Sequence, residues 1–356
     1  MNTEILRITD VEKQSSELQH AAELLQRGQL VVFPTETVYG LGGNGLDADA
    51  ARRIYAAKGR PSDNPLILHI ADAADAEAYA YTNATYDRLA RAFMPGPLTV
   101  ILPKRACIPD SATGGLPTVA LRCPSHPVAH RLIELAGIPI AAPSANLSGK
   151  PSPTTAAHVI EDLCGRVDLI LDGGECDIGL ESTIVSVNAD GGVTLLRPGA
   201  ITYDALCMVV DNVTVADAVT HRLKENERPL SPGMKYRHYA PTAPLYLLTG
   251  KDADVLAFLT QELAGGKCTV LCYDEERSLI SPTPTSACIP IGRREDLSTQ
   301  AKTLFSALRK ADATDAEVIY AHLPPMEGLG LALYNRMIRA AAHQIKHIPD
   351  ASPINS

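Results

Sequence analysis

Two cations that could bind an anion occur close together in the segment of residues 58–66. Lys58 and Arg60 flank a glycine, which would let a ligand approach the backbone, and Pro61 and Pro65 stiffen the segment. One cation would be enough to cap the helix expected just before them, whereas two fit an anion site better. The segment therefore favours phosphate or carboxylate binding over simple helix capping.

Short apolar strands are expected on both sides of this segment, at residues 30–33 and 66–68. Between them, residues 47–57 have the pattern of a helix capped by Asp47 or Asp49. The stretch of residues 34–42 ends the first strand and supplies threonine hydroxyls. The order of strand, hydroxyl loop, helix, cationic loop and strand would place hydroxyls and cations between two buried strands.

A second polar loop, residues 143–154, follows an expected strand at 138–142 and precedes an expected helix. Its serine hydroxyls and backbone N–H groups are of the kind that hold phosphates. A turn with a helix cap is the alternative, because serine and threonine favour such positions anyway. The loop matches neither the Gly-x-x-x-x-Gly-Lys-Ser/Thr pattern nor a Gly-x-Ser-x-Gly nucleophile elbow.

Two arginines each end an expected strand and are followed by a proline or a Cys-Pro pair. Arg122 precedes Cys123-Pro124, and Arg197 precedes Pro198-Gly199. Both could clamp a carboxylate or phosphate, although each could equally form an ordinary surface salt bridge. The paired histidines at 126/130 and 343/347 lack the accompanying glutamate of a zinc motif, so we expect surface or core histidines and no metal site.

The glycines of residues 40–45 satisfy the Gly-x-Gly-x-x-Gly pattern of dinucleotide-binding turns. Against this alternative, a polar hexapeptide separates them from the preceding strand, Asp72 comes late, and the cationic loop has no place in that pattern. A nicotinamide-dependent oxidoreductase is therefore the second hypothesis. A double-stranded RNA-binding or regulatory module without catalysis is the third.

The alternation of expected strands and helices predicts two α/β domains. Several strands between residues 30 and 215 follow one another without a helix, which predicts a mixed sheet flanked by helices near 85–93, 127–136 and 154–163. Beyond a polar, proline-bearing stretch, strands near 245–248, 268–272, 287–291 and 317–320 alternate with helices near 253–263 and 296–310, and a last helix is expected near 332–345. We predict a domain at 1–220, a linker at 221–244 and a smaller parallel α/β domain at 245–356.

Composition narrows the class of protein. The 356 residues are 46% hydrophobic with no unbroken apolar run of membrane-spanning length, which predicts a soluble globular protein without a membrane partner. The polar first ten residues do not resemble a secretion signal, so we expect a cytoplasmic protein. Eight scattered cysteines predict reduced, mostly buried thiols, and the net charge of −9 argues against coating of nucleic acid.

Several motifs occur in the order found in the YrdC/Sua5 family of threonylcarbamoyl-AMP synthases, which this chain resembles along its whole length. The motifs are Pro34-Thr35-Glu36-Thr37-Val38-Tyr39-Gly40-Leu41, Lys58-Gly59-Arg60-Pro61 with Asn64-Pro65-Leu66, Pro143-Ser144-Ala145-Asn146-Leu147-Ser148-Gly149, Ser182-Thr183-Ile184-Val185 and Arg197-Pro198-Gly199. Residues 231–241 resemble the linker of the two-domain Sua5 form. The carbamoyltransferase HypF also contains such a module, but the further domains of that longer protein are not expected here.

The resemblance implies a twisted mixed-sheet YrdC-like catalytic domain and a Rossmann-like C-terminal domain. It implies a nucleotidyltransferase that condenses L-threonine, bicarbonate or CO2, and ATP into threonylcarbamoyl-AMP and pyrophosphate, with Mg²⁺ accompanying ATP. The product would serve the t6A modification of tRNA, so tRNA and the transferase proteins of that pathway are possible partners.

Site residues are implied motif by motif. Threonine would be held by Thr37, His69, Arg122, Ser182 and the backbone near Ala142. The nucleotide would be held by Arg60, Asn64, Thr118, Ser144, Ser152 and Arg197, with Lys58 beside its phosphates, and Lys58 and Arg60 would neutralise charge during the reaction. The linker residues Lys235, Tyr236, Arg237 and His238 could form a lid over the phosphates, or the linker could be a mere tether.

Overall fold

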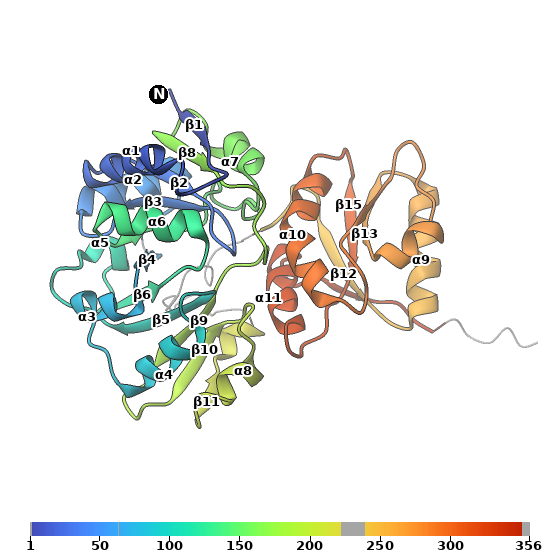
Figure 1. Ribbon diagram of the computed structural model, residues 1–356. Helices are drawn as coiled ribbons and strands as arrows, with labels where there is room; N and C mark the ends of the chain where they lie inside the picture. Colours follow the sequence, from blue (N-terminus) through green and yellow to red (C-terminus); the bar gives the residue numbers. More distant parts are fainter. Residues whose placement is uncertain (1, 63, 222–238, 351–356) are drawn as a thin grey trace, which may run out of the picture. The chain divides into compact units, whose positions relative to one another are not determined.

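A computed structural model describes residues 2–62, 64–221 and 239–350 (Figure 1). The chain divides into two compact units, the first formed by residues 1–148 and 152–236 and the second by residues 149–151 and 237–356. Each unit is built around its own β-sheet. Among the described residues, no helix combines the length and the apolar character needed to cross a membrane.

The first unit contains an eleven-stranded sheet in the order β1-β8-β2-β3-β7-β4-β6-β5-β9-β10-β11. Its strands are β1 Glu4–Arg7, β2 Val31–Phe33, β3 Gly40–Asn44, β4 Ile67–His69, β5 Leu98–Pro103, β6 Thr118–Arg122, β7 Ile140–Ala141, β8 Leu169–Asp172, β9 Thr183–Val187, β10 Val193–Arg197 and β11 Val213–Val215. Neighbours pair in both senses: β4 runs parallel to β6 but antiparallel to β7. The predicted mixed sheet is confirmed.

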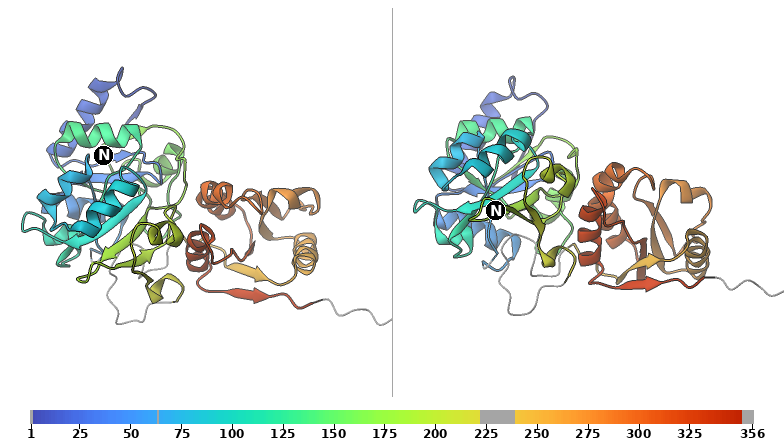
Figure 2. Two further views of the ribbon diagram at one scale, coloured as in Figure 1. Left: turned by 60° about the horizontal axis from the view of Figure 1, so that its bottom comes forward. Right: turned by 90° about the horizontal axis from the view of Figure 1, so that it is seen from below.

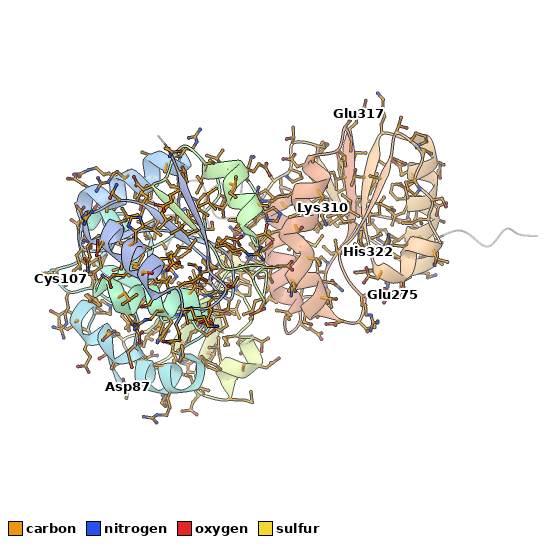
Figure 3. All side chains as sticks on the ribbon, turned by 45° about the horizontal axis from the view of Figure 1, so that its top comes forward. Asp87, Cys107, Glu275, Lys310, Glu317 and His322 are labelled. Atoms are coloured by element: carbon orange, nitrogen blue, oxygen red, sulfur yellow. The ribbon has the colours of Figure 1, made fainter. Side chains whose placement is uncertain are left out.

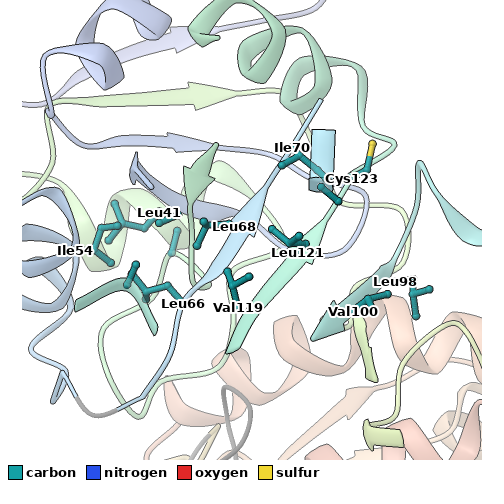
Figure 4. Close-up of a cluster of buried hydrophobic side chains, with 14 of the residues drawn as sticks. Leu41, Ile54, Leu66, Leu68, Ile70, Leu98, Val100, Val119, Leu121 and Cys123 are labelled. Carbon is teal, nitrogen blue, oxygen red and sulfur yellow. The ribbon is translucent and has the colours of Figure 1, made fainter. Parts of the chain in front are cut away.

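Helices cover both faces of this sheet (Figure 1). They are α1 Ser15–Gln26, α2 Ala48–Lys58, α3 Ala76–Tyr79, α4 Ala84–Phe93, α5 Asp110–Thr113, α6 Pro127–Ala136, α7 Ala156–Leu163 and α8 Tyr203–Cys207. Along β2, Val31 and Phe33 join the core under α1 and α6, whereas Val32 joins the core on the other face. This period-two alternation divides the apolar side chains between two cores, and Figure 4 shows the larger one.

The second unit contains a five-stranded sheet in the order β14-β13-β15-β12-β16, in which every pairing is parallel (Figure 2). Its strands are β12 Leu245–Thr249, β13 Cys268–Cys272, β14 Ala287–Pro290, β15 Val318–His322 and β16 Ile345–His347, and its helices are α9 Asp252–Gly265, α10 Leu297–Asp312 and α11 Gly330–Ala340. His322, labelled in Figure 3, ends β15, and its Nε2 lies 2.9 Å from Oε1 of the buried Glu276. The parallel α/β architecture expected for this part of the chain is confirmed.

The glycine-rich stretch differs from its dinucleotide-binding interpretation. Residues 40–44 form strand β3, which pairs antiparallel with β2 and β7, and not a turn that opens a helix. A Cβ atom on Gly42 would lie 2.8 Å from a ring carbon of Phe33 and 2.9 Å from a methyl of Ile140. The glycine thus admits bulky neighbours from both flanking strands, and the oxidoreductase hypothesis loses its structural basis.

The last predicted helix is also shorter than expected. It ends at Ala340 because Ala342 and His343 adopt left-handed backbone angles, with φ of 48° and 65°, which a right-handed helix cannot continue. The chain then turns into β16. The predicted set also lacked β1 and α1, which the first 26 residues form.

The cysteines are partly as predicted. No cysteine of the described residues forms a disulfide, and Cys123, Cys176, Cys268 and Cys272 are buried. However, Cys107, Cys164 and Cys207 are exposed, so the expectation of mostly buried thiols fits only half of them.

Candidate active site

The hydroxyl loop between β2 and β3 is stabilised by hydrogen bonds from its own threonine side chains. The Thr35 hydroxyl donates to the Val38 carbonyl at 2.7 Å and lies 2.8 Å from the Thr37 hydroxyl. The loop also meets the serine loop, because the Ala145 N–H donates to the Tyr39 carbonyl at 2.8 Å. Thr37 is fully buried. The structure therefore joins two polar segments that lie about a hundred residues apart in the sequence.

The cationic loop begins where α2 ends. Asp47 caps the start of this helix by accepting from the Asp49 N–H, and Gly59 ends it in a left-handed conformation. The buried Lys58 ammonium donates to the backbone carbonyls of Ser144 and, at 2.6 Å, of Asn146. Lys58 is thus held at the serine loop rather than in solvent, as expected if the two loops form one site.

Arg60 and Asn64 lie at opposite ends of the cationic loop. The Arg60 Nη2 donates to the Asn64 carbonyl at 3.3 Å, and the Tyr55 hydroxyl donates to the same carbonyl at 2.8 Å. The Asn64 side chain is fully buried, yet within the described residues neither its nitrogen nor its oxygen has a hydrogen-bond partner. Because leaving a buried amide unpaired is unfavourable, this side chain is available to a ligand.

Parallel pairing of β4 with β6 sets His69 opposite Arg122. The His69 ring packs edge-on against Phe33 with centroids 6.0 Å apart, and its Nδ1 lies 3.3 Å from the Ile140 carbonyl. This face is opposite to the one that carries Leu68 and Ile70, as alternation along the strand predicts. Burial, together with the positive charge of Arg122, lowers the pKa of His69 to about 3, so its imidazole is neutral at neutral pH.

Arg122 forms a buried ion pair, with its Nη2 2.8 Å from the Glu36 Oε1. Burial by itself would raise the pKa of the Glu36 carboxyl, but the charge of Arg122, together with contacts from the Arg122 side chain and from backbone N–H groups, outweighs it and holds that pKa below the ordinary value. The arginine is 4% exposed and the glutamate 6%. The surface salt bridge considered for Arg122 is therefore wrong.

Arg197, at the end of β10, is buried as well, so its surface alternative is also wrong. Its Nε donates to the Ser182 carbonyl at 3.0 Å and its Nη2 to the Ser182 hydroxyl at 3.1 Å. The same hydroxyl lies 2.7 Å from the hydroxyl of Thr99 on β5. One buried network thus connects a residue predicted for threonine with a residue predicted for the nucleotide.

The remaining predicted residues occupy separate positions. Ser152 is buried and donates to the Glu181 carboxylate at 2.6 Å. Ala142 is buried just after β7, where its N–H donates to the Ile67 carbonyl. Thr118 begins β6 and is half-buried, at the opposite end of that strand from Arg122. The lid residues Lys235, Tyr236, Arg237 and His238 lie outside the described residues.

Sequence reasoning missed four residues that hold the predicted ones in place: Glu36, Thr99, Asn146 and Glu181. Glu36 had a signal, since it is the one carboxylate within the hydroxyl-rich motif of residues 34–39. Thr99 had no such sequence signal, because a single threonine in an apolar strand is common and does not indicate a site. Across the part of the chain that the structure describes, no three His, Cys, Asp or Glu side chains gather to hold a metal ion.

Comparison with known proteins places this chain in a family. The family model described as "Telomere recombination", for Sua5, YciO and YrdC proteins, matches residues 23–199. The model for the threonylcarbamoyl-AMP synthase C-terminal domain matches residues 201–342. Since the two models follow one another along the chain, this protein belongs to the Sua5/YciO/YrdC family in its two-domain Sua5 form.

Several relatives are similar to this chain over most of their length. The threonylcarbamoyl-AMP synthase of Bacillus subtilis is 46% identical over 92% of this chain and 94% of its own. That of Pyrococcus abyssi is 43% identical over 91% and 94% of the two chains. A crystal structure of P. abyssi Sua5 complexed with L-threonine has a TM-score of 0.88 and 40% identity, covering 98% of this chain and 100% of that one.

Proposed function

We propose that this chain is an L-threonylcarbamoyladenylate synthase, a nucleotidyltransferase that makes threonylcarbamoyl-AMP and pyrophosphate from L-threonine, bicarbonate or CO2, and ATP. The observation that carries the proposal is the 46% identity with the B. subtilis synthase over 92% of this chain. The product would enter the t6A modification of tRNA, so tRNA and the transferase proteins of that pathway are the expected partners.

Threonine would lie between the hydroxyl loop and strands β4, β6 and β9. Thr37, Ser182 and the backbone at Ala142 supply polar contacts, His69 supplies a neutral imidazole, and Arg122 supplies the positive charge for the carboxylate. The buried positions of Thr37, His69, Arg122 and Ser182 support this assignment, because a buried charge or hydroxyl is favourable when a ligand completes its contacts.

ATP would lie along the cationic and serine loops. Arg60, Asn64, Thr118, Ser144, Ser152 and Arg197 would contact the nucleotide, with Lys58 beside the phosphates. The contact of Lys58 with the loop of Ser144 supports this placement, and so does the unpaired amide of Asn64. Mg²⁺ would enter with ATP as part of the substrate.

The proposed reaction has two steps. The neutral amine of threonine attacks CO2 and loses a proton to water to form a carbamate, and a carbamate oxygen then attacks the α-phosphorus of ATP, so that pyrophosphate leaves. No covalent enzyme intermediate is needed. The protein contributes orientation and neutralisation of the negative charge that gathers on the leaving pyrophosphate, and we assign that electrostatic role to Lys58 and Arg60.

We also propose the division of labour along the chain. Residues 1–220 would form the catalytic domain, residues 221–244 a linker that either covers the labile carbamate and adenylate or only tethers the two domains, and residues 245–356 the C-terminal α/β domain. Removal of everything from residue 230 onward would leave full synthetic activity if the linker were only a tether, and would lower it if the linker is a lid.

An omission assay tests the function. The full-length protein is incubated with ATP, Mg²⁺, L-threonine and bicarbonate, and the adenylate is sought by mass spectrometry while each component is left out in turn. We expect adenylate and pyrophosphate only in the complete mixture. Salt-sensitive binding of RNA without pyrophosphate release would instead support the binding-module hypothesis.

A further inference from the structure

Glu36 is a buried carboxylate whose partner among the described residues is Arg122. Their atoms Oε1 and Nη2 are 2.8 Å apart, and the two side chains are 6% and 4% exposed. Within that part of the chain, neither oxygen of Glu36 accepts a well-aligned hydrogen bond, although the backbone N–H groups of Glu36 and Ser125 approach the carboxylate closely enough to help lower its pKa. An ion pair buried with so few supporting hydrogen bonds is a poor source of stability, since desolvation of both charges offsets much of their attraction.

The pair does, however, fix the arginine. The Arg122 Nε contacts the Gly96 carbonyl at 3.5 Å, which is too long to hold the guanidinium firmly. Nη2 lies 2.8 Å from the Glu36 Oε1, in a charge contact whose N–H is not aligned for a hydrogen bond. Nη1 has no partner in residues 2–62, 64–221 and 239–350. One edge of the planar group is therefore occupied by the carboxylate while the other amino group is open to a second anion.

We propose that Glu36 is a positioning residue for substrate: it holds the guanidinium of Arg122 so that the free amino group faces the carboxylate of L-threonine. The proposal rests on the assignment of Arg122 to threonine made above. Its specific claim is that Glu36 acts through Arg122 and touches neither ATP nor the reacting carbamate.

The variant Glu36→Gln keeps the size of the side chain and removes its charge. We expect the KM for L-threonine to rise at least about 10-fold, because a charge-assisted contact is lost, while kcat and the KM for ATP change less than about 3-fold. Glu36→Asp retains the charge but shortens the side chain, so a smaller rise is expected. This second variant keeps the test informative if the glutamine variant does not fold.

A double-substitution cycle separates positioning from direct contact. L-threonine binding is measured by calorimetry for the wild-type protein, Glu36→Gln, Arg122→Gln and the double variant. If Glu36 acts through Arg122, the double variant binds threonine as weakly as Arg122→Gln alone. Additive losses, or unchanged threonine affinity in Glu36→Gln, would overturn the proposal.

A matched control is available in the other unit. Glu276 is 4% exposed and is ion-paired with Arg294, whose Nη2 lies 2.9 Å from the Glu276 Oε1, so Glu276→Gln removes a comparable buried charge. It should lower stability without changing threonine affinity. If the wild-type protein itself fails to bind L-threonine, the proposed function fails; if only the Glu36 variants behave as wild type, the function stands and the positioning role does not.

Discussion

The Lys58 ammonium lies 2.6 Å from the backbone carbonyl oxygen of Asn146, and the Lys58 carbonyl in turn accepts from the Ser148 N–H at 2.9 Å. A single residue therefore fastens the end of α2 to the serine loop through both its side chain and its backbone. The Lys58 charge and the serine loop, both expected to contact ATP, are therefore held together by direct hydrogen bonds. Loss of the ammonium should affect the charge at the phosphates and the position of the loop.

We expect Lys58→Ala to lower turnover at least ~100-fold while L-threonine binding changes little, because stabilisation of the leaving pyrophosphate is lost. Pyrophosphate release and threonine calorimetry measure the two quantities. Lys104→Ala is the control, since Lys104 also donates to a backbone carbonyl, that of Ile108 at 3.0 Å, but is not assigned to the site. Pyrophosphate release near the wild-type rate in Lys58→Ala would refute the electrostatic role.

Asn64→Leu should uncouple stability from nucleotide binding. The buried amide has no partner within the described part of the chain, so its removal relieves a penalty of about 1–3 kcal/mol and should leave the free energy of unfolding unchanged or higher. Nucleotide affinity should fall about 10-fold or more. Urea unfolding without ligand and calorimetry with ATP measure these two effects.

Asn188→Leu gives the contrast for that experiment. Its amide nitrogen donates to the Thr194 hydroxyl at 3.2 Å, so this substitution breaks an existing contact and should lower the free energy of unfolding with ATP affinity unchanged. If Asn64→Leu is destabilised as much as Asn188→Leu, the amide of Asn64 is satisfied in the unliganded protein.

The pH dependence of stability should report on His69. Its pKa is lowered from 6.5 to about 3 in the folded protein, so the unfolded chain binds more protons between these values. The resulting stability is complete above pH 6.5 and is lost as pH falls. At pH 5 the loss is about 2 kcal/mol.

His69→Gln removes this contribution, so the variant's free energy of unfolding should fall less than that of the wild-type protein between pH 7.5 and pH 5. Urea unfolding at several pH values measures the difference. Parallel curves for the two proteins would show that His69 is protonated as readily in the folded state as in the unfolded one.

Thr99→Val tests the network around Ser182. Removal of the Thr99 hydroxyl takes away the contact at 2.7 Å that holds the Ser182 hydroxyl, and the KM for L-threonine should rise about 3-fold or more. Thr85→Val is the matched control: it removes a buried hydroxyl that donates to the Gly191 carbonyl at 2.9 Å. Both variants should lose about 1 kcal/mol of stability, and equal effects on KM would argue against a role for Thr99 at the site.

Sequence patterns predicted the elements whose ends are marked by residues such as proline and glycine. Helix α6 begins at Pro127 and ends before Gly137, which is left-handed, and these are the bounds of the helix predicted at 127–136. The glycines of β3 were misread because their role depends on Phe33 and Ile140, which belong to neighbouring strands. A local pattern contains no information about such neighbours.

In the candidate site, too, some features could be predicted from local sequence and others depend on the assembled sheet. The meeting of the cationic and serine loops could be anticipated in part, because the cationic loop leads into one expected strand and the serine loop follows another; these strands, β4 and β7, pair antiparallel, which brings the two loops to the same edge of the sheet. The pairing of Glu36 with Arg122 could not, since it joins residues 86 positions apart, as their numbers show, whose side chains meet only after β4, β6 and the hydroxyl loop are assembled. Burial of Arg122 and Arg197 likewise follows from the completed sheet.

The parallel sheet of the second unit ends in two short strands that resist pairing with other chains. Strand β14 finishes with Pro290, which has no N–H to offer, and the opposite border, β16, is three exposed residues long. The Lys346 ammonium sits there, 4.2 Å from the ring centre of Phe258. Intermolecular β-addition is therefore disfavoured on either side, which protects this half of the protein from aggregating through its sheet.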